Sequence, residues 1–120
     1  MPIDVLWEEM DWEDGTLGPA PTRVVDILRD DHSLVEQFLA GLNDADFPYL
    51  AFISLETVTV FHQRHITQLL TELECLCGRD HAPEVAKHLR AVLQFVSAAH
   101  GPEDTSIAFR VRAQKEKHAA

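Results

Sequence analysis

Apolar residues recur at intervals of three and four along much of the chain, the spacing of one helical face. Thr22, a residue type that favours helix starts, is followed by an apolar stripe that predicts a helix to Gly41 or Leu42. The stripe consists of Val24, Leu28, Val35, Phe38, Leu39 and Leu42. The polar residues 43–46 then predict a turn.

Two further helices are expected in the middle of the chain. Proline at position 48 and glycine at position 78 favour a helix over 48–78, although the β-branched run at 57–61 weakens that prediction locally. A third helix is expected to begin after Pro83 and to end before Gly101. Its inward-facing residues are Val85, Leu89, Val92, Val96 and Ala99.

The last segment, residues 104–120, fits two structures. Ile107, Phe109 and Val111 alternate with other residues, which is typical of a strand, while Ile107 and Val111 also suit a short helix. We expect a helix, because a lone strand in an otherwise helical chain has no partner. The predicted fold is therefore all-α, a small antiparallel bundle of three to four helices.

Residues 1–21 read as a separate acidic arm that contains two tryptophans, and residues 22–120 as the bundle with a basic C-terminal tail. The arm has one apolar helical face, made by Ile3, Leu6, Trp7 and Met10. Its acids are Asp4, Glu8, Glu9, Asp11, Glu13 and Asp14. The arm could dock on its own domain or in the groove of a protein partner, and its attraction to the basic tail could support a homodimer.

Composition narrows the class of protein. With 120 residues, of which 46% are apolar, the chain holds one folded domain. A net charge of −10 argues against nucleic-acid binding, and no apolar run is long enough for a membrane span. Without a secretory signal, and with Cys75 and Cys77 as free thiols, a cytoplasmic location is expected. The common phosphate-loop and nucleophile motifs are absent, so an enzyme is the less expected reading.

Seven histidines are the unusual feature of the composition. His32, His62, His65 and His88 fall on or beside the predicted inward faces, and carboxylates lie one or two turns away. The candidate metal ligands are His32, Glu36, His62, His65, Glu72, Glu84 and His88. Imidazole with carboxylate suits iron, zinc or manganese, yet a histidine on an apolar stripe is equally a buried residue with one hydrogen bond. Cys75, Cys77 and His81 form a second zinc candidate, without the usual Cys-x-x-Cys spacing.

Residues 28–39, together with Phe61-His62-Gln63-Arg64-His65, resemble the hemerythrin-like, HHE-type cation-binding domains. The resemblance covers about residues 22–105 and is partial: the family's second helix has a glutamate four residues after its histidine, where Ile66 follows His62 here. The resemblance implies a diiron site within four helices. The departures from the family pattern leave three alternatives open: a mononuclear site, a degenerate site, or no site.

Two functions follow. The first is a metal-binding bundle, with iron the expected metal, that binds or senses oxygen or iron. The alternative is a non-catalytic regulatory or protein-interaction bundle that acts through its acidic arm, in which the histidines are structural and no cofactor is bound.

Overall fold

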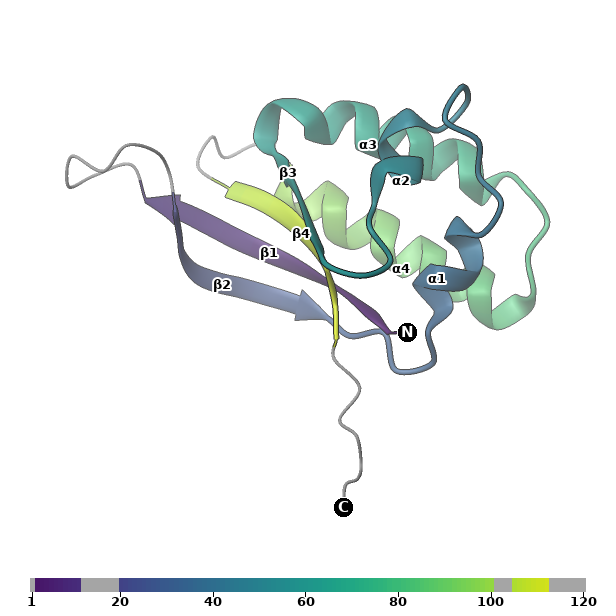
Figure 1. The fold of residues 1–120 in the computed structure, drawn as a ribbon, viewed down its shortest axis with the longest axis horizontal. Coiled ribbons are helices and arrows are strands. Elements are labelled where there is room, and N and C mark those ends of the chain that lie inside the picture. The colour runs from purple at the N-terminus through teal and green to yellow at the C-terminus, as the bar shows by residue number, and fades with distance from the viewer. Residues whose placement is uncertain (1, 12–19, 101–104, 113–120) are drawn as a thin grey trace, which may run out of the picture.

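Four strands form one antiparallel sheet at the centre of the fold (Figure 1). The structure is a computed structural model that describes residues 2–11, 20–100 and 105–112. In the order β2-β1-β4-β3, the sheet contains β1 (Ile3–Asp11), β2 (Ala20–Leu28), β3 (Val58–His62) and β4 (Thr105–Val111). The fold is therefore α+β, and the predicted all-α bundle is wrong, as is the helical bundle that the hemerythrin-like resemblance implies.

The helices lie to one side of this sheet (Figure 1). They are α1 (Leu34–Leu39), α2 (Pro48–Phe52), α3 (Gln63–Cys77) and α4 (Pro83–Ala99). α3 and α4 pack against each other and against β4, while α1 contacts α4 and α2 contacts α3. The two long helices thus cover the sheet, and α2 lies beside the edge strand β3 (Figure 1).

The core forms where the alternating side chains of the strands meet the apolar stripes of the helices. Ile3 and Val5 of β1, with Ile107 and Phe109 of β4, belong to the main hydrophobic cluster. From the two long helices the cluster takes Ile66, Leu69, Leu73, Leu76, Val85, Leu89, Val92, Val96 and Ala99. The five inward residues predicted for the helix after Pro83 are all buried, so that prediction is confirmed.

β1 corrects the helix expected from the spacing of Ile3, Leu6, Trp7 and Met10. It runs between β2 and β4, and Leu6, which lies on the face opposite Val5, is also buried although it is outside the main cluster. Because a strand inside a sheet can be apolar on both faces, the polar alternation that identifies a strand is lost. The segment 1–21 therefore holds β1 and the start of β2, which belong to the sheet.

Three other helix predictions are corrected in the same way. The helix expected over 22–42 is replaced by β2, a turn and the six-residue α1. The one expected over 48–78 is interrupted by β3, at the β-branched run that weakened the prediction. Residues 105–111 form β4, because β1 and β3 supply the partners that the sequence did not reveal.

Two carboxylates join the ends of these elements. Asp30 is fully buried and accepts hydrogen bonds from backbone N–H groups at the start of β1 and in the first turn of α1, those of Ile3, Leu34 and Val35. Asp4 accepts the Asp30 backbone N–H at 3.0 Å and the guanidinium of Arg112 at 2.7 and 3.1 Å. Burial tends to raise the pKa of Asp4, but these hydrogen bonds and the charge of Arg112 outweigh it and lower that pKa.

Candidate functional site

The seven predicted metal ligands are spread over the fold. His32 is exposed in the turn after β2, Glu36 lies on α1, and Glu84 is exposed at the start of α4. In the described ranges, no three His, Cys, Asp or Glu side chains come together as a possible metal site. The residues predicted to hold iron, zinc or manganese, and the Cys75, Cys77 and His81 group, therefore form no such cluster there. The cause is the fold, because their convergence assumed continuous helices.

Two of these residues, Glu72 and His88, are enclosed or partly enclosed by the fold. Glu72, only 2% exposed, accepts the backbone N–H groups of Tyr49 and Leu50. His88 on α4 has a buried Nε2 atom without a hydrogen-bond partner in the described structure. Burial lowers the pKa of His88, against an opposing effect of Asp30 and Asp31. Burial thus favours the neutral form of the His88 imidazole.

The acids of the N-terminal segment do not form a separate surface in the described residues. Asp4 is buried against Arg112, while Glu8 and Glu9 are half-buried on β1. Burial raises the pKa of Glu8, against the opposing charge of Arg110. The Asp11 side chain and residues 12–19 lie outside the described residues, so the docking predicted for the acidic segment remains a prediction.

A pocket of about 360 Å³ opens between α2 and β3. It is lined by Pro48, Tyr49, Phe52, Val60, Phe61, His62 and His65. The Tyr49 ring stacks on Phe61 with centroids 5.8 Å apart, and Phe61 packs edge-on against Phe109 in the core. The walls are therefore mainly aromatic and apolar, anchored through Phe61, as is usual for ligand pockets.

This pocket lies at the free edge of β3. Val60, Phe61 and His62 all line it, although successive side chains of a strand point to opposite faces of the sheet. The N–H of Val111 donates to the Thr57 carbonyl at 3.4 Å, so the odd-numbered residues of β3 turn their backbone groups toward β4. Val60 consequently directs its N–H and C=O away from the sheet and toward the pocket.

The wall opposite β3 is positioned by a buried carboxylate. α2 has only five residues, begins with Pro48 and has no side-chain cap at Phe47. Its first N–H groups have no partners inside the helix, and Glu72 of α3 accepts two of them at 2.9 and 3.0 Å. The start of a helix at Pro48 was predicted correctly. The role of Glu72 was not predicted, because it depends on a contact between residues 22 positions apart in the sequence.

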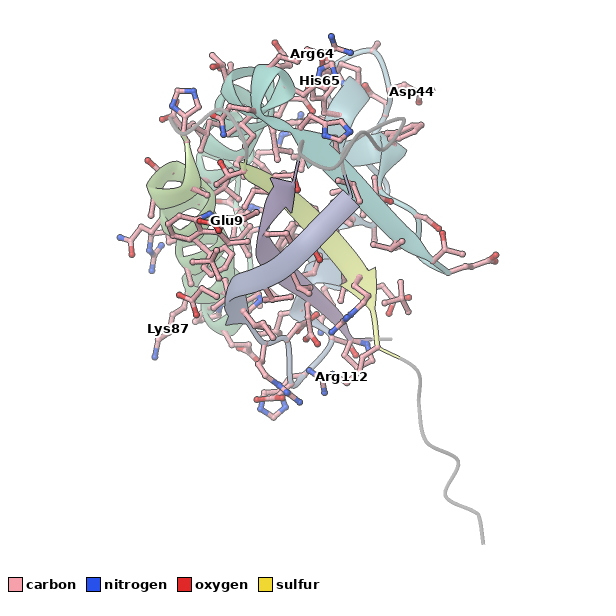
Figure 2. The ribbon with its side chains drawn as sticks, turned by 90° about the vertical axis from the view of Figure 1, so that its left-hand side faces the viewer. Glu9, Asp44, Arg64, His65, Lys87 and Arg112 are labelled. Atoms are coloured by element: carbon pink, nitrogen blue, oxygen red, sulfur yellow. The ribbon has the colours of Figure 1, made fainter. Side chains whose placement is uncertain are left out.

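Hydrogen bonds beside the pocket determine whether the Tyr49 hydroxyl donates or accepts. The Nε–H of Arg64 donates to Nε2 of His65 at 3.3 Å, so Nε2 is an acceptor and the proton of this imidazole lies on Nδ1. The Nδ1 atom is 3.0 Å from the Tyr49 hydroxyl oxygen and donates to it. The hydroxyl proton of Tyr49 is then available to a ligand. Figure 2 shows Arg64 and His65 side by side at one end of the molecule.

Exposed apolar side chains gather at the edges of the sheet. Those that are large and exposed among the described residues are Val24, Val25, Ile27, Phe52, Leu55, Val58 and Val60. They lie on the edge strands β2 and β3, on α2, or in the connection from α2 to β3. Phe52, 71% exposed, stands at the pocket itself. Contiguous apolar patches mark interaction surfaces, and Phe52 and Val60 both line the pocket.

Comparison with known proteins leaves the site to be interpreted from its geometry. No family model, no curated protein and no solved structure gives a significant match to this chain. In the described part of the chain, no helix has the length and apolar character that crossing a membrane requires.

Proposed function

We propose that this chain is a protein-interaction module that binds an extended segment of a partner protein as an additional strand beside β3. One observation carries the proposal: the outward N–H and C=O groups of Val60 face an apolar pocket at the edge of the sheet. Main-chain hydrogen bonds to an exposed edge supply affinity in this mode of recognition, and a neighbouring pocket selects a side chain. The proposed surface is β3 with α2, in place of the acidic arm.

The five residues of the edge strand β3 include no proline, no lysine and no bulge. Proteins protect such edges with proline, lysine, inward charges or bulges, because an exposed edge pairs with other chains. Residues 58–62 read Val-Thr-Val-Phe-His, and their pairing with β4 is regular. Val58 and Val60 are 51% and 39% exposed, so a docked strand would cover apolar surface as well as gain hydrogen bonds.

The cysteines support a location for this interaction. Cys75 is exposed and Cys77 half-buried, and both are free thiols. Unbridged thiols are typical of a reducing compartment, which supports the cytoplasm as the place where the partner is met.

The substitution Val60→Pro tests the proposal. It removes the outward N–H while leaving the bonds between β3 and β4 intact, and an edge position of this kind tolerates proline. Val60→Thr is the matched control, because it keeps the N–H and the β-branched shape. Random peptides displayed on phage are selected on the wild-type protein, and the enriched peptides are synthesised and titrated calorimetrically against all three proteins.

We expect peptides that bind the wild type and Val60→Thr similarly, and Val60→Pro at least about tenfold more weakly, since one hydrogen bond is lost and the strand can no longer dock closely. Circular dichroism checks that all three proteins are folded. Equal binding to Val60→Pro, or no enriched peptide, would contradict the proposal. So would a wild-type dimer that Val60→Pro dissociates, because a second copy of the chain would then occupy the edge.

A further inference from the structure

The side chains of Tyr49 and Arg64 offer hydrogen-bond donors at this pocket. The Tyr49 hydroxyl is free to donate because His65 already donates to its oxygen. Arg64 uses Nε for His65, which leaves its terminal nitrogens for another acceptor. The His62 imidazole is exposed on the β3 side of the same pocket. Among the described lining residues there is no carboxylate.

We infer that the pocket takes an aromatic or large aliphatic side chain with a carboxylate next to it, so that the docked segment carries an apolar anchor beside an acidic residue. The apolar body would pack against Phe52 and the stacked rings of Tyr49 and Phe61. The carboxylate would accept from the Tyr49 hydroxyl and meet the guanidinium of Arg64. This inference depends on the proposed strand-addition site for its partner, but the chemistry of the pocket can be tested separately.

The charge of the whole protein does not determine this selectivity. The net charge of −10 repels an anion at long range, but at physiological salt such forces are screened beyond about 8 Å. The carboxylate of Glu72 contacts the pocket's wall, but it is buried and already accepts the N–H groups of α2 and the Gln68 side chain. The Tyr49 hydroxyl and the Arg64 guanidinium are the side-chain groups that can donate to a carboxylate here.

The size of the pocket agrees with one anchor side chain. A volume of about 360 Å³ is at the lower end of the range for ligand sites, and Val60, Phe61 and His62 of β3 line it. An aromatic ring placed there can pack with Tyr49 and Phe52, because aromatic pairs gain stability from offset or edge-on contacts. A docked segment would thus form main-chain hydrogen bonds to Val60 and place its anchor side chain in the pocket at the same time.

The chain contains a single tyrosine, which makes the pocket observable by itself. Protein labelled with ring-¹³C tyrosine gives the signals of Tyr49 alone. It is titrated at physiological salt with 3-phenylpropionate and with 3-phenylpropylamine, which share the apolar body and differ in the sign of the head group. Both are small, so their dissociation constants are expected in the millimolar range.

We expect 3-phenylpropionate to shift the Tyr49 signals and to bind at least about tenfold more tightly than the amine, the size of a hydrogen bond to a charged group. Arg64→Gln should weaken binding of the carboxylate about threefold, as for an exposed ion pair. Arg90→Gln, on the exposed side of α4, makes the same change in net charge and should have no effect.

Three results would overturn the inference: unchanged Tyr49 signals, equal binding of the two probes, or equal effects of Arg64→Gln and Arg90→Gln. The probes form no strand, so this test is independent of the edge of β3. A carboxylate preference with no peptide binding would contradict the strand-addition proposal alone. Peptides that require the Val60 N–H, without a carboxylate preference, would contradict only the inference about the anchor.

Discussion

Glu72 tests whether a buried carboxylate holds the wall of the pocket. Its Oε1 atom accepts N–H groups from Tyr49 and Leu50 at 3.0 and 2.9 Å, and its Oε2 atom accepts the Gln68 amide at 2.9 Å. Glu72→Ala leaves two N–H groups at the start of α2 without an acceptor. Each unsatisfied buried donor costs about 1–3 kcal/mol, so for two donors we expect a loss of about 2–6 kcal/mol in the free energy of unfolding.

Glu72→Gln is the matched control for this loss. Its amide oxygen can still accept from the start of α2, and the Gln68 side chain can turn its own oxygen toward the new amide nitrogen. Only the charge is lost, so we expect a cost of about 1 kcal/mol. Since domains of this kind are stable by about 5–15 kcal/mol, both variants should remain folded and measurable.

Urea unfolding gives the two free energies, and hydrogen exchange locates the effect. In Glu72→Ala the Leu50 amide should exchange much faster, while amides in the middle of α4 change only with global stability. A loss below about 1 kcal/mol for Glu72→Ala, with the Leu50 amide still protected, would show that Glu72 does not hold α2.

Three further predictions concern other parts of the fold. Burial lowers the pKa of His88 below its ordinary value of 6.5. The contribution of His88 to stability is therefore present above pH 6.5 and is lost as the pH falls toward the lowered pKa. His88→Leu should reduce the difference between the urea midpoints measured at about pH 7.5 and about pH 5.5. The pKa of Asp4 is lowered below 3.8, so the contribution of Asp4 to stability is present above pH 3.8 and is lost on acidification. Arg112→Met should raise the pKa of Asp4, so that acid unfolding, followed by circular dichroism, begins at a higher pH. Phe52→Ser should change the free energy of unfolding by less than about 0.5 kcal/mol, because the side chain is 71% exposed, yet weaken 3-phenylpropionate binding in the Tyr49 titration.

Local signals correctly predicted α4, the start of α2 and the end of α3. The helix after Pro83 has its predicted stripe buried, and α3 ends at Cys77 with Gly78 as its C-cap. The helix start at Pro48 also agrees with α2. Each of these features depends on residues within a few positions of one another, which is the range over which spacing and capping signals act.

The sheet could not be derived from the same signals, because its pairing is not local. β1 and β4 pair through residues about one hundred positions apart, such as Ile3 with Val111. With residues 3–11 predicted as a helix, β4 has no predicted partner. The alternation of Ile107 and Phe109, which is typical of a strand, is then outweighed by the lack of a partner. One incorrect element therefore led to a second.

The candidate site followed the same course. Histidines at helical spacing suggested a metal centre, but His62 ends a strand and only His65 lies on α3. His62 and His65 do both line the pocket, together with aromatic residues that had been assigned to a helix stripe. The β-branched run at 57–61 was the available signal for the site, since it indicated the edge strand that the pocket adjoins.

Amide hydrogen exchange along β3 is the most direct test of the central claim. In the free protein, we expect slow exchange for the Thr59 and Phe61 amides, which bond to β4, and fast exchange for the Val60 amide between them. On addition of a selected peptide, the Val60 amide should become slow while its neighbours stay slow. A Val60 amide already as protected as that of Phe61, or one that a bound peptide leaves unchanged, would contradict the assignment of this edge as the binding site.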